Sequence, residues 1–334
     1  MPRNVVAVDR LLLVSSSPRL PAGVLSWPAW EALRSGPVHC LDPETPQARA
    51  VRAAGVAVHR MVGTATARAR AGAFRDLARG GRVAVWLAGP DGDPGFARAL
   101  GDLVAREGSS GVELEVIYGS WDPPGARLLD VVAVMDRLRS PGGCPWDAEQ
   151  THGSLAPYLL EEAYELLEAI EEDDLDHLRE ELGDVLLQVA FHSRLAEERP
   201  DGQRWSIDDV AGDLVAKLVR RHPHVFAERE VAGAAEVAAN WEEIKAEEKG
   251  RRSVTDGVPL GQPALALAAK LRRRAEKAGL EIASPDGKDI GARLFALVEE
   301  AVTTGVEPEA ALRATVRAYR TAVRAAEGSA ADED

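Results

Sequence analysis

The stretch from Glu161 to Asp184 constrains this chain more than any other, because it sets twelve carboxylates against one arginine in two short segments. The first segment predicts a helix, since its apolar residues recur at helical spacing and fall in one arc of the wheel. That arc contains Leu159, Leu160, Ala163, Leu166, Leu167 and Ile170. Glu162 lies at the edge of the arc, and Glu165 lies next to it.

The second segment predicts a buried helix. From Leu178 to Leu195 apolar residues fall nearly all round the wheel, a pattern typical of a helix that is covered on every side. Asp184 projects between Phe191 and Leu195, and Glu181 lies three residues before it. Each segment therefore carries two acids three residues apart, at or inside a packing surface.

Two such pairs of acids are unfavourable unless a cation compensates them. Buried ions cost several kcal/mol each, and two carboxylates about 5 Å apart repel by roughly 3 kcal/mol at an effective dielectric near 20. Arg179 alone cannot neutralise four acids. A hard divalent cation can, because Mg²⁺ prefers carboxylate oxygens and retains waters for a phosphate substrate. We expect the other acids to be solvent charges, among them Glu168, Glu171, Glu172, Asp173 and Asp174.

Composition narrows the class of protein. The 334 residues suit two or three domains, and a formal charge of −14 argues against a nucleic acid partner, because phosphate binding needs a basic face. That charge does not exclude a nucleotide, whose phosphates a metal can bridge. No apolar run reaches the roughly 18 residues of a membrane span, and the N-terminus lacks the pattern of a signal peptide. We therefore expect a cytoplasmic protein with no membrane partner.

Residues 1–120 predict an α/β domain. Short β-rich runs alternate with helical stretches such as Thr64–Arg79 and Gly95–Arg106, a pattern typical of a largely parallel sheet. The runs are Val5–Val14, Val38–Leu41, Val56–His59, Arg82–Ala88 and Val112–Tyr118. Segments reading SSSPRLPAGVLSWPAWEAL and VAVWLAGPDGDPGFARAL resemble a tetrapyrrole methylase domain. Ser15–Ser17 stand where that family has glycines, which implies a degenerate scaffold without methyl-donor binding.

Amphipathic helices are predicted further along the chain, at Leu128–Leu138 and at Ile207–Val219. The second is opened by Ser206. Three cations at its C-terminal end follow one another on one side of the helix. These cations are Lys217, Arg220 and Arg221. Beside an acidic metal site they suit phosphate oxygens, which arginine often binds through two hydrogen bonds. The alternative is that they pair with the surplus acids.

Four segments in this part of the chain resemble the MazG family, the all-α nucleoside triphosphate pyrophosphohydrolases. They read GGCPWDAEQTHGSLAPYLLEEAYELLEAI, REELGDVLLQV, KLVRRHPHVF and WEEIKAEEK. The family pattern of EExxE, a spacer and ExxD matches Glu161–Glu165 and Glu181–Asp184. The resemblance implies that an all-α MazG-like helical bundle, the catalytic domain over residues 125–250, follows the α/β domain.

The resemblance also implies the chemistry. The catalytic residues, which would hold Mg²⁺ (or Mn²⁺ as a substitute) on facing helices, would be Glu162, Glu165, Glu181 and Asp184. The metal would activate a water that splits a nucleoside triphosphate into nucleoside monophosphate and pyrophosphate, in nucleotide-pool house-cleaning. Trp241 and Lys245 lie four residues apart on one helical face, where the family contacts its nucleotide. Core packing is the alternative for Trp241.

Residues 262–327 predict a degenerate second MazG-like repeat, which follows the linker Ser253–Pro263. A stretch parallel to Glu181–Asp184 is present, but Asp289 and Ala292 replace its two acids and no EExxE precedes it. A four-helix site with one active repeat then needs a partner. That partner would be a second chain in a homodimer, or the degenerate repeat.

Other functions fit the sequence less well. The main alternative is a non-catalytic helical bundle that regulates or binds another protein and whose acids only face solvent. A di-iron carboxylate bundle needs Glu-x-x-His pairs, which are absent, and a Nudix hydrolase needs a long glycine-led box, which is absent around Arg179–Gly183. The number of metal ions, the general base and the preferred nucleotide stay open.

Overall fold

The computed structural model describes residues 8–62, 66–107, 112–227, 231–234, 236, 237, 240, 241, 244, 248, 253–285 and 287–331. The chain divides into two compact units, Met1–Ala211 and Gly212–Asp334. The first unit contains the α/β part and the helices that carry the acidic stretch. The predicted division into domains at residues 1–120, 125–250 and 262–327 stays a prediction.

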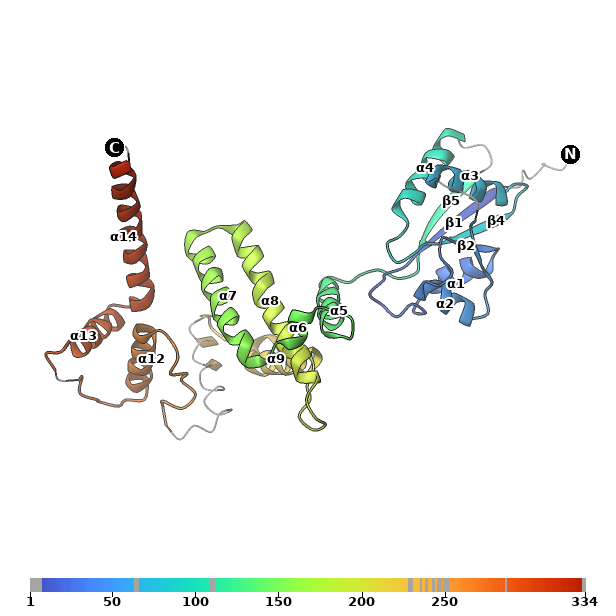
Figure 1. The fold of residues 1–334 in the computed structure, drawn as a ribbon. Helices are drawn as coiled ribbons and strands as arrows, with labels where there is room; N and C mark the ends of the chain where they lie inside the picture. The colour runs from blue at the N-terminus through green and yellow to red at the C-terminus, as the bar shows by residue number, and fades with distance from the viewer. Residues whose placement is uncertain are drawn as a thin grey trace. The chain divides into compact units, whose positions relative to one another are not determined.

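The N-terminal part is built on a five-stranded sheet in the order β3-β2-β4-β1-β5, and every pair of neighbouring strands is parallel (Figure 1). The strands are β1 (Asp9–Ser15), β2 (Val38–Cys40), β3 (Val58–Arg60), β4 (Val83–Leu87) and β5 (Val112–Tyr118). β1 and β4 lie inside the sheet. β4 is apolar throughout and β1 is apolar from Leu11 to Val14, because a strand inside a parallel sheet is covered on both faces. The predicted parallel α/β arrangement is confirmed.

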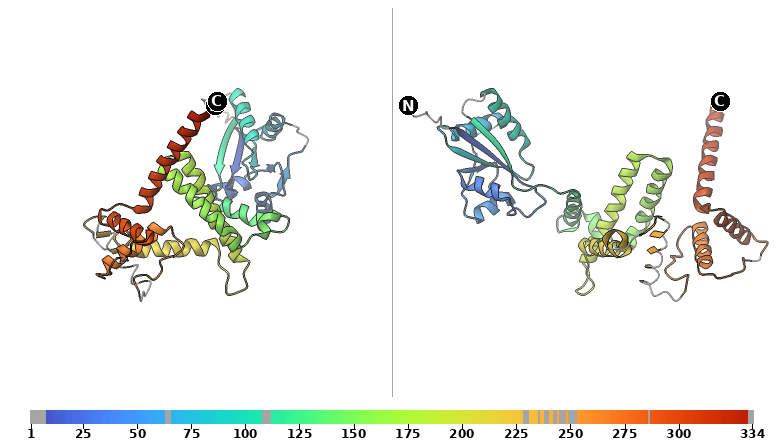
Figure 2. Two further views of the ribbon diagram at one scale, coloured as in Figure 1. Left: turned by 60° about the vertical axis from the view of Figure 1, so that its left-hand side comes forward. Right: turned by 180° about the vertical axis from the view of Figure 1, so that it is seen from behind.

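Helices cover both faces of this sheet (Figures 1 and 2). The helices are α1 (Trp27–Arg34), α2 (Pro46–Ala53), α3 (Ala67–Leu77) and α4 (Pro94–Glu107). One buried cluster joins α1 and α2 to the sheet through side chains such as Leu33 and Val51. A second cluster joins α3 and α4 to the opposite face, where Phe74 and Phe96 pack on Trp86.

The helices α1 and α2 were not predicted from the sequence. Both are only eight residues long, so their periodicity is weak. Each nevertheless carries a start signal, a hydroxyl cap followed closely by proline. Ser26 Oγ accepts from the amide of Ala29 at 3.4 Å, and Thr45 Oγ1 accepts from that of Ala48 at 3.3 Å.

After β5, the described part of the chain contains helices and no strands. The first unit continues with α5 (Arg127–Arg139), α6 (Pro145–Glu149), α7 (His152–Glu172), α8 (Leu175–Glu197) and the start of α9 (Ile207–Arg221). The second unit contains the end of α9, α10 (Pro223–Phe226), α12 (Ala264–Lys277), α13 (Ile290–Thr303) and α14 (Pro308–Ala331). The helical class of this part is confirmed, and a closed bundle stays a prediction. None of the described helices is long and apolar enough to cross a membrane.

α7 and α8 form a hairpin and lie side by side in every view (Figures 1 and 2). Thr151 starts α7 with a capping box in which its side chain and that of Ser154 exchange backbone hydrogen bonds. Asp173 ends α7 in the left-handed conformation, with φ of 57°. Asp174 then caps α8, because its Oδ1 accepts from the amides of Asp176 and His177 at 3.1 Å. A tight turn thus reverses the chain.

The burial of this hairpin corrects the sequence prediction. The half of the hairpin farther from its turn is covered by α5, in a cluster made of Met135, Leu155, Ala190, Phe191 and Leu195. Its other half is not covered within the described chain: Leu160 is 60% exposed on α7 and Leu182 is 53% exposed on α8. The prediction that α8 is buried all round therefore holds only toward its end, from Ala190 onward. The apolar arc of α7 is likewise largely open.

Candidate functional site

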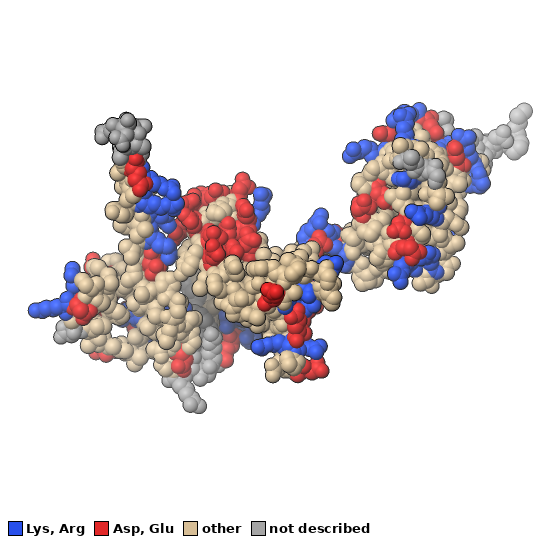
Figure 3. Space-filling view, viewed as in Figure 1, with Lys and Arg blue, Asp and Glu red and all other residues tan. Residues whose placement is uncertain are grey.

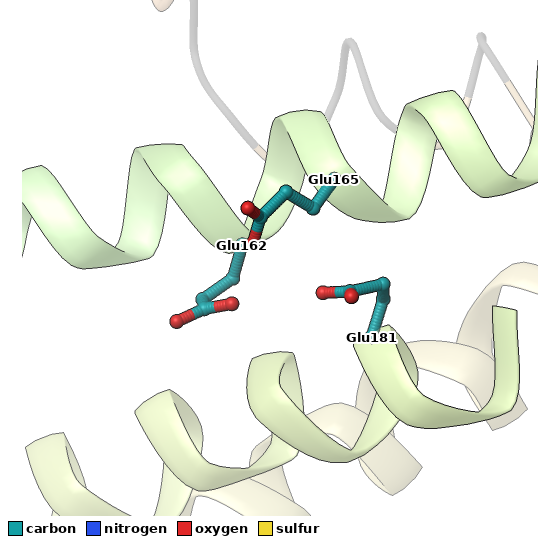
Figure 4. Close-up of side chains that lie close together, drawn as sticks. All are labelled: Glu162, Glu165 and Glu181. Atoms are coloured by element: carbon teal, nitrogen blue, oxygen red, sulfur yellow. The ribbon is translucent and has the colours of Figure 1, made fainter. Parts of the chain in front are cut away.

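Three acids from the hairpin face one another toward the end that carries its turn. Glu162 and Glu165 project from α7 toward Glu181 on α8 (Figure 4), and one carboxylate oxygen of each lies within 4.8 Å of the others. Acidic side chains gather over this end of the hairpin (Figure 3). Because the turn at Asp173 and Asp174 sets α8 antiparallel to α7, acids that are far apart on the chain meet here.

Glu181 is the buried member of this cluster, with 6% of its surface exposed. Its Oε1 lies 3.0 Å from Nε2 of His177, one turn earlier on the same helix. Its Oε2 is buried and has no hydrogen-bond partner among the described residues. Buried polar oxygens rarely lack a partner. Glu181 is therefore held through one oxygen, while the other has no partner in the part of the chain that the structure describes.

The electrostatic environment of Glu162 includes the charges of the other acids in the cluster. Its pKa is raised, first by burial and then by the negative charges of Asp184, Glu165 and Glu181. Asp184 does not belong to the close group of three, but its carboxylate is near enough to act on Glu162. The structure thus brings three of the four predicted ligands together and places the fourth beside them.

The donor set fits a hard divalent cation. All the close oxygens belong to carboxylates, which Mg²⁺ and Mn²⁺ prefer, and a cation would relieve the repulsion that raises the pKa of Glu162. Within the described chain, no lysine or arginine forms an ion pair with Glu162, Glu165 or Glu181. His177 was not predicted as part of this site. Its spacing of four residues from Glu181 is the signal that could have identified it.

The predicted substrate-binding cations lie on α9. Lys217 is half-buried there, whereas Arg220 and Arg221 both form ion pairs with Glu248. Pairing with a surplus acid was the alternative for these arginines, and this structure shows that pairing. Glu248 was not singled out from the sequence. It follows Trp241 by seven residues, close to two helical turns, and this spacing could have drawn attention to it.

The other predicted nucleotide contacts have separate outcomes. Trp241 packs against two neighbours: the guanidinium of Arg221 lies 5.5 Å from its ring centre, and the ring of His222 meets it edge-on at 4.8 Å. Lys245 lies outside the described residues. The substrate-binding role of all five residues stays a prediction.

The parallel position in the second unit has a different structural role. Asp289 lies just before α13, and its Oδ1 accepts from the amide of Ala292 at 3.0 Å. It therefore acts as a helix cap, where Asp is among the favoured residues. Its partner in the motif position is Ala292, which has no ligand atom. A degenerate repeat over residues 262–327 remains a prediction.

Comparisons with known proteins match the acidic hairpin to a known domain. The MazG nucleotide pyrophosphohydrolase domain matches residues 150–226, which contain all four predicted ligands. The chain is 54% identical over 244 residues to an uncharacterized 26.1 kDa protein of Streptomyces cacaoi. The aligned region covers 72% of this chain and all of that protein. It is 54% identical over 156 residues to the nucleoside triphosphate pyrophosphohydrolase of Mycobacterium tuberculosis, but spans only 47% of that protein.

A third relative is aligned over most of its own length. The nucleoside triphosphate pyrophosphohydrolase/pyrophosphatase MazG of Thermotoga maritima is 40% identical over 220 residues, which is 58% of this chain and 83% of that protein. The matched domain, this relative and the acidic hairpin point to the same family. The chain belongs to the MazG family of nucleoside triphosphate pyrophosphohydrolases.

Proposed function

We propose that this protein hydrolyses nucleoside triphosphates to nucleoside monophosphate and pyrophosphate with Mg²⁺ held by Glu162, Glu165, Glu181 and Asp184. The observation that carries the proposal is the buried Oε2 of Glu181, which has no partner among the described residues, on a carboxylate group that faces Glu162 and Glu165. A carboxylate oxygen in that position is unfavourable in a structural cluster and is well suited to a cation.

The chain's own residues prepare this site. His177 holds Oε1 of the Glu181 carboxylate and leaves Oε2 for a cation. Glu162 and Glu165 supply oxygens from the facing helix, and Asp184 adds negative charge at the edge of the cluster. When bound, Mg²⁺ supplies positive charge to the triphosphate and lowers the pKa of a coordinated water.

We infer that a second copy of the chain covers the open half of the hairpin. Exposed apolar side chains line both helices there, and a patch of this kind marks an interaction surface on soluble proteins. They are Leu159, Leu160, Ile170, Leu182, Leu187 and Val189. Two hairpins packed through these faces would form a four-helix bundle around the acids, as the sequence motifs imply for a homodimer.

The alternative, a non-catalytic interaction module, accounts less well for the acids. A surface that only needs charge would keep its carboxylates in solvent, where the cost of ionisation is low. Glu181 is instead 6% exposed and has one oxygen without a partner in the described chain. We therefore assign a catalytic role to the acids. From the family resemblance we also propose a cellular role in nucleotide-pool house-cleaning in the cytoplasm.

The test is a panel of canonical and damaged nucleoside triphosphates, incubated with the full chain with and without Mg²⁺. The expected products are pyrophosphate and the monophosphate in equal amounts, and only with the metal. Orthophosphate as the first product, or turnover that survives chelation of divalent metals, would contradict the proposal.

A further inference from the structure

Arg220 and Arg221 at the end of α9 share one carboxylate, that of Glu248. Arg220 donates from Nε to Oε1 at 2.7 Å, and Arg221 donates to Oε2 from Nε at 3.1 Å and from Nη2 at 2.5 Å. Two guanidinium groups therefore meet a single negative charge. The group keeps one net positive charge, on a chain whose formal charge is −14.

The two arginines are held to different degrees. The side chain of Arg221 is 11% exposed, and its guanidinium lies between Glu248 and the ring of Trp241. The side chain of Arg220 is 54% exposed, although the side chain of Glu248 is only 17% exposed. The Arg221 side chain is therefore packed against its neighbours, whereas the Arg220 side chain is anchored by Glu248 and exposed to solvent.

Glu248 holds Arg220 by only one nitrogen. Hydrogen bonds from Arg221 and then from Arg220 lower the pKa of Glu248 to about 2, so the carboxylate is charged at any pH at which the protein would be assayed. In the described part of the chain, Nη1 and Nη2 of Arg220 form no hydrogen bond. The Nη1–Nη2 edge, which can bind phosphate through two parallel bonds, is thus without a partner among the described residues, on a side chain that is 54% exposed.

We propose that Glu248 is a positioning residue for substrate: it holds Arg220 through Nε so that its Nη1–Nη2 edge binds a phosphate group of the nucleoside triphosphate. This inference rests on the proposed function. An arginine side chain loses conformational freedom when it is ordered, and Glu248 removes that loss from the binding step. Because the group retains a positive charge, Glu248 does not cancel the attraction for phosphate.

The experiment measures steady-state hydrolysis of ATP, and inhibition by inorganic pyrophosphate, for the full chain and for Glu248→Ala and Glu248→Gln. Loss of the anchor is expected to raise KM and the pyrophosphate inhibition constant about tenfold, the equivalent of one hydrogen bond to a charged group, with kcat within about twofold. Glu248→Gln keeps an oxygen for Nε of Arg220, so its KM is expected to lie between those of the wild type and Glu248→Ala.

Glu276→Ala is the matched control. Glu276 pairs with Arg272 at 3.8 Å in the same unit and is exposed, so its removal is expected to leave KM unchanged. A double-mutant cycle separates positioning from general damage, because Glu248→Ala should add nothing to Arg220→Ala if Glu248 acts through that arginine. If Glu248→Ala is poorly folded, Glu248→Gln takes its place in the cycle.

Several results would overturn the inference. An unchanged KM in folded Glu248→Ala means that Glu248 does not position the substrate, and a lower KM means that it competes with phosphate. Fully additive losses in the double variant point to a structural role. These outcomes are distinct from failure of the proposed function, which would appear as no pyrophosphate release by the wild type.

Discussion

His177 lies 3.0 Å from Oε1 of Glu181, one helical turn away on α8, and leaves Oε2 of the same carboxylate buried and without a described partner. A histidine in this position would orient a metal ligand without adding an oxygen to the cluster. Carboxylate ligands in metal sites commonly have such an outer partner, whose loss reduces metal affinity by about 10- to 100-fold.

Replacing His177 therefore tests the site without removing a ligand. We expect His177→Ala to weaken Mn²⁺ binding about tenfold or more, because the Glu181 carboxylate becomes free to rotate. Titration calorimetry of the metal-free protein measures this directly. His224→Ala, on α10 in the other unit, is the control and should bind Mn²⁺ as the wild type does. Equal affinity for His177→Ala and wild type would mean that His177 does not orient Glu181.

The histidine pair at the base of the hairpin predicts a dependence of stability on pH. Nδ1 of His152 and Nδ1 of His192 are 2.7 Å apart, and their rings are stacked. The pKa of His192 is lowered, first by burial and then by His152. Below the ordinary histidine pKa of about 6.5 the unfolded chain binds more protons than the folded one, so the free energy of unfolding falls as pH is lowered.

We expect His192→Asn to lose part of this dependence, measured as urea unfolding between about pH 7.5 and 5.5. His39→Asn is a parallel test in the α/β part, because the pKa of His39 is also lowered, by burial and then by His59. Each variant should remove its own share of the slope. The same slope in His192→Asn as in the wild type would show that His192 does not stay neutral in the folded protein.

The cap at Asp289 predicts a difference between stability and activity. Asp289→Ala removes the side chain that accepts from the amide of Ala292, so we expect a loss of about 1 kcal/mol of stability. Asp289→Asn keeps a cap and should be nearly neutral. Neither variant should change turnover per folded molecule, as measured by pyrophosphate release. A large loss of turnover in folded Asp289→Asn would show that the second repeat takes part in catalysis.

The open face of the hairpin predicts an assembly. Leu160→Glu places a charge on a side chain that is 60% exposed in the single chain, and we expect it to convert a dimer into a monomer in light scattering. Val116→Glu is the control, because Val116 is 46% exposed on β5, away from the hairpin. A wild-type chain that is monomeric at all concentrations would exclude the homodimer.

Much of the site followed from sequence because its signals are local. The alternation of strands and helices in the first 120 residues, and the two acid pairs at helical spacing, each depend on neighbours within a few turns. The positions of α1 and α2 did not follow, since eight residues give little periodicity.

What could not be predicted depends on contacts between distant residues. The pairing of Arg220 and Arg221 with Glu248 joins residues nearly 30 positions apart, and the two-turn spacing of Glu248 from Trp241 does not by itself say that these arginines pair with it rather than with another acid. The exposure of Leu160 and Leu182 also escaped prediction, because a helical wheel shows which residues need cover and not whether this chain provides it.

The central claim is that Glu181 completes a metal site for pyrophosphate release. The most direct measurement is the Mg²⁺-dependent rate of that release for the wild type, Glu181→Gln and Glu172→Gln, the last being an exposed acid at the end of α7. Glu181→Gln preserves shape and removes the charge, so we expect a fall of about a hundredfold or more in kcat with the fold intact. Glu172→Gln should match the wild type. A folded Glu181→Gln variant that releases pyrophosphate at the wild-type rate would contradict the account.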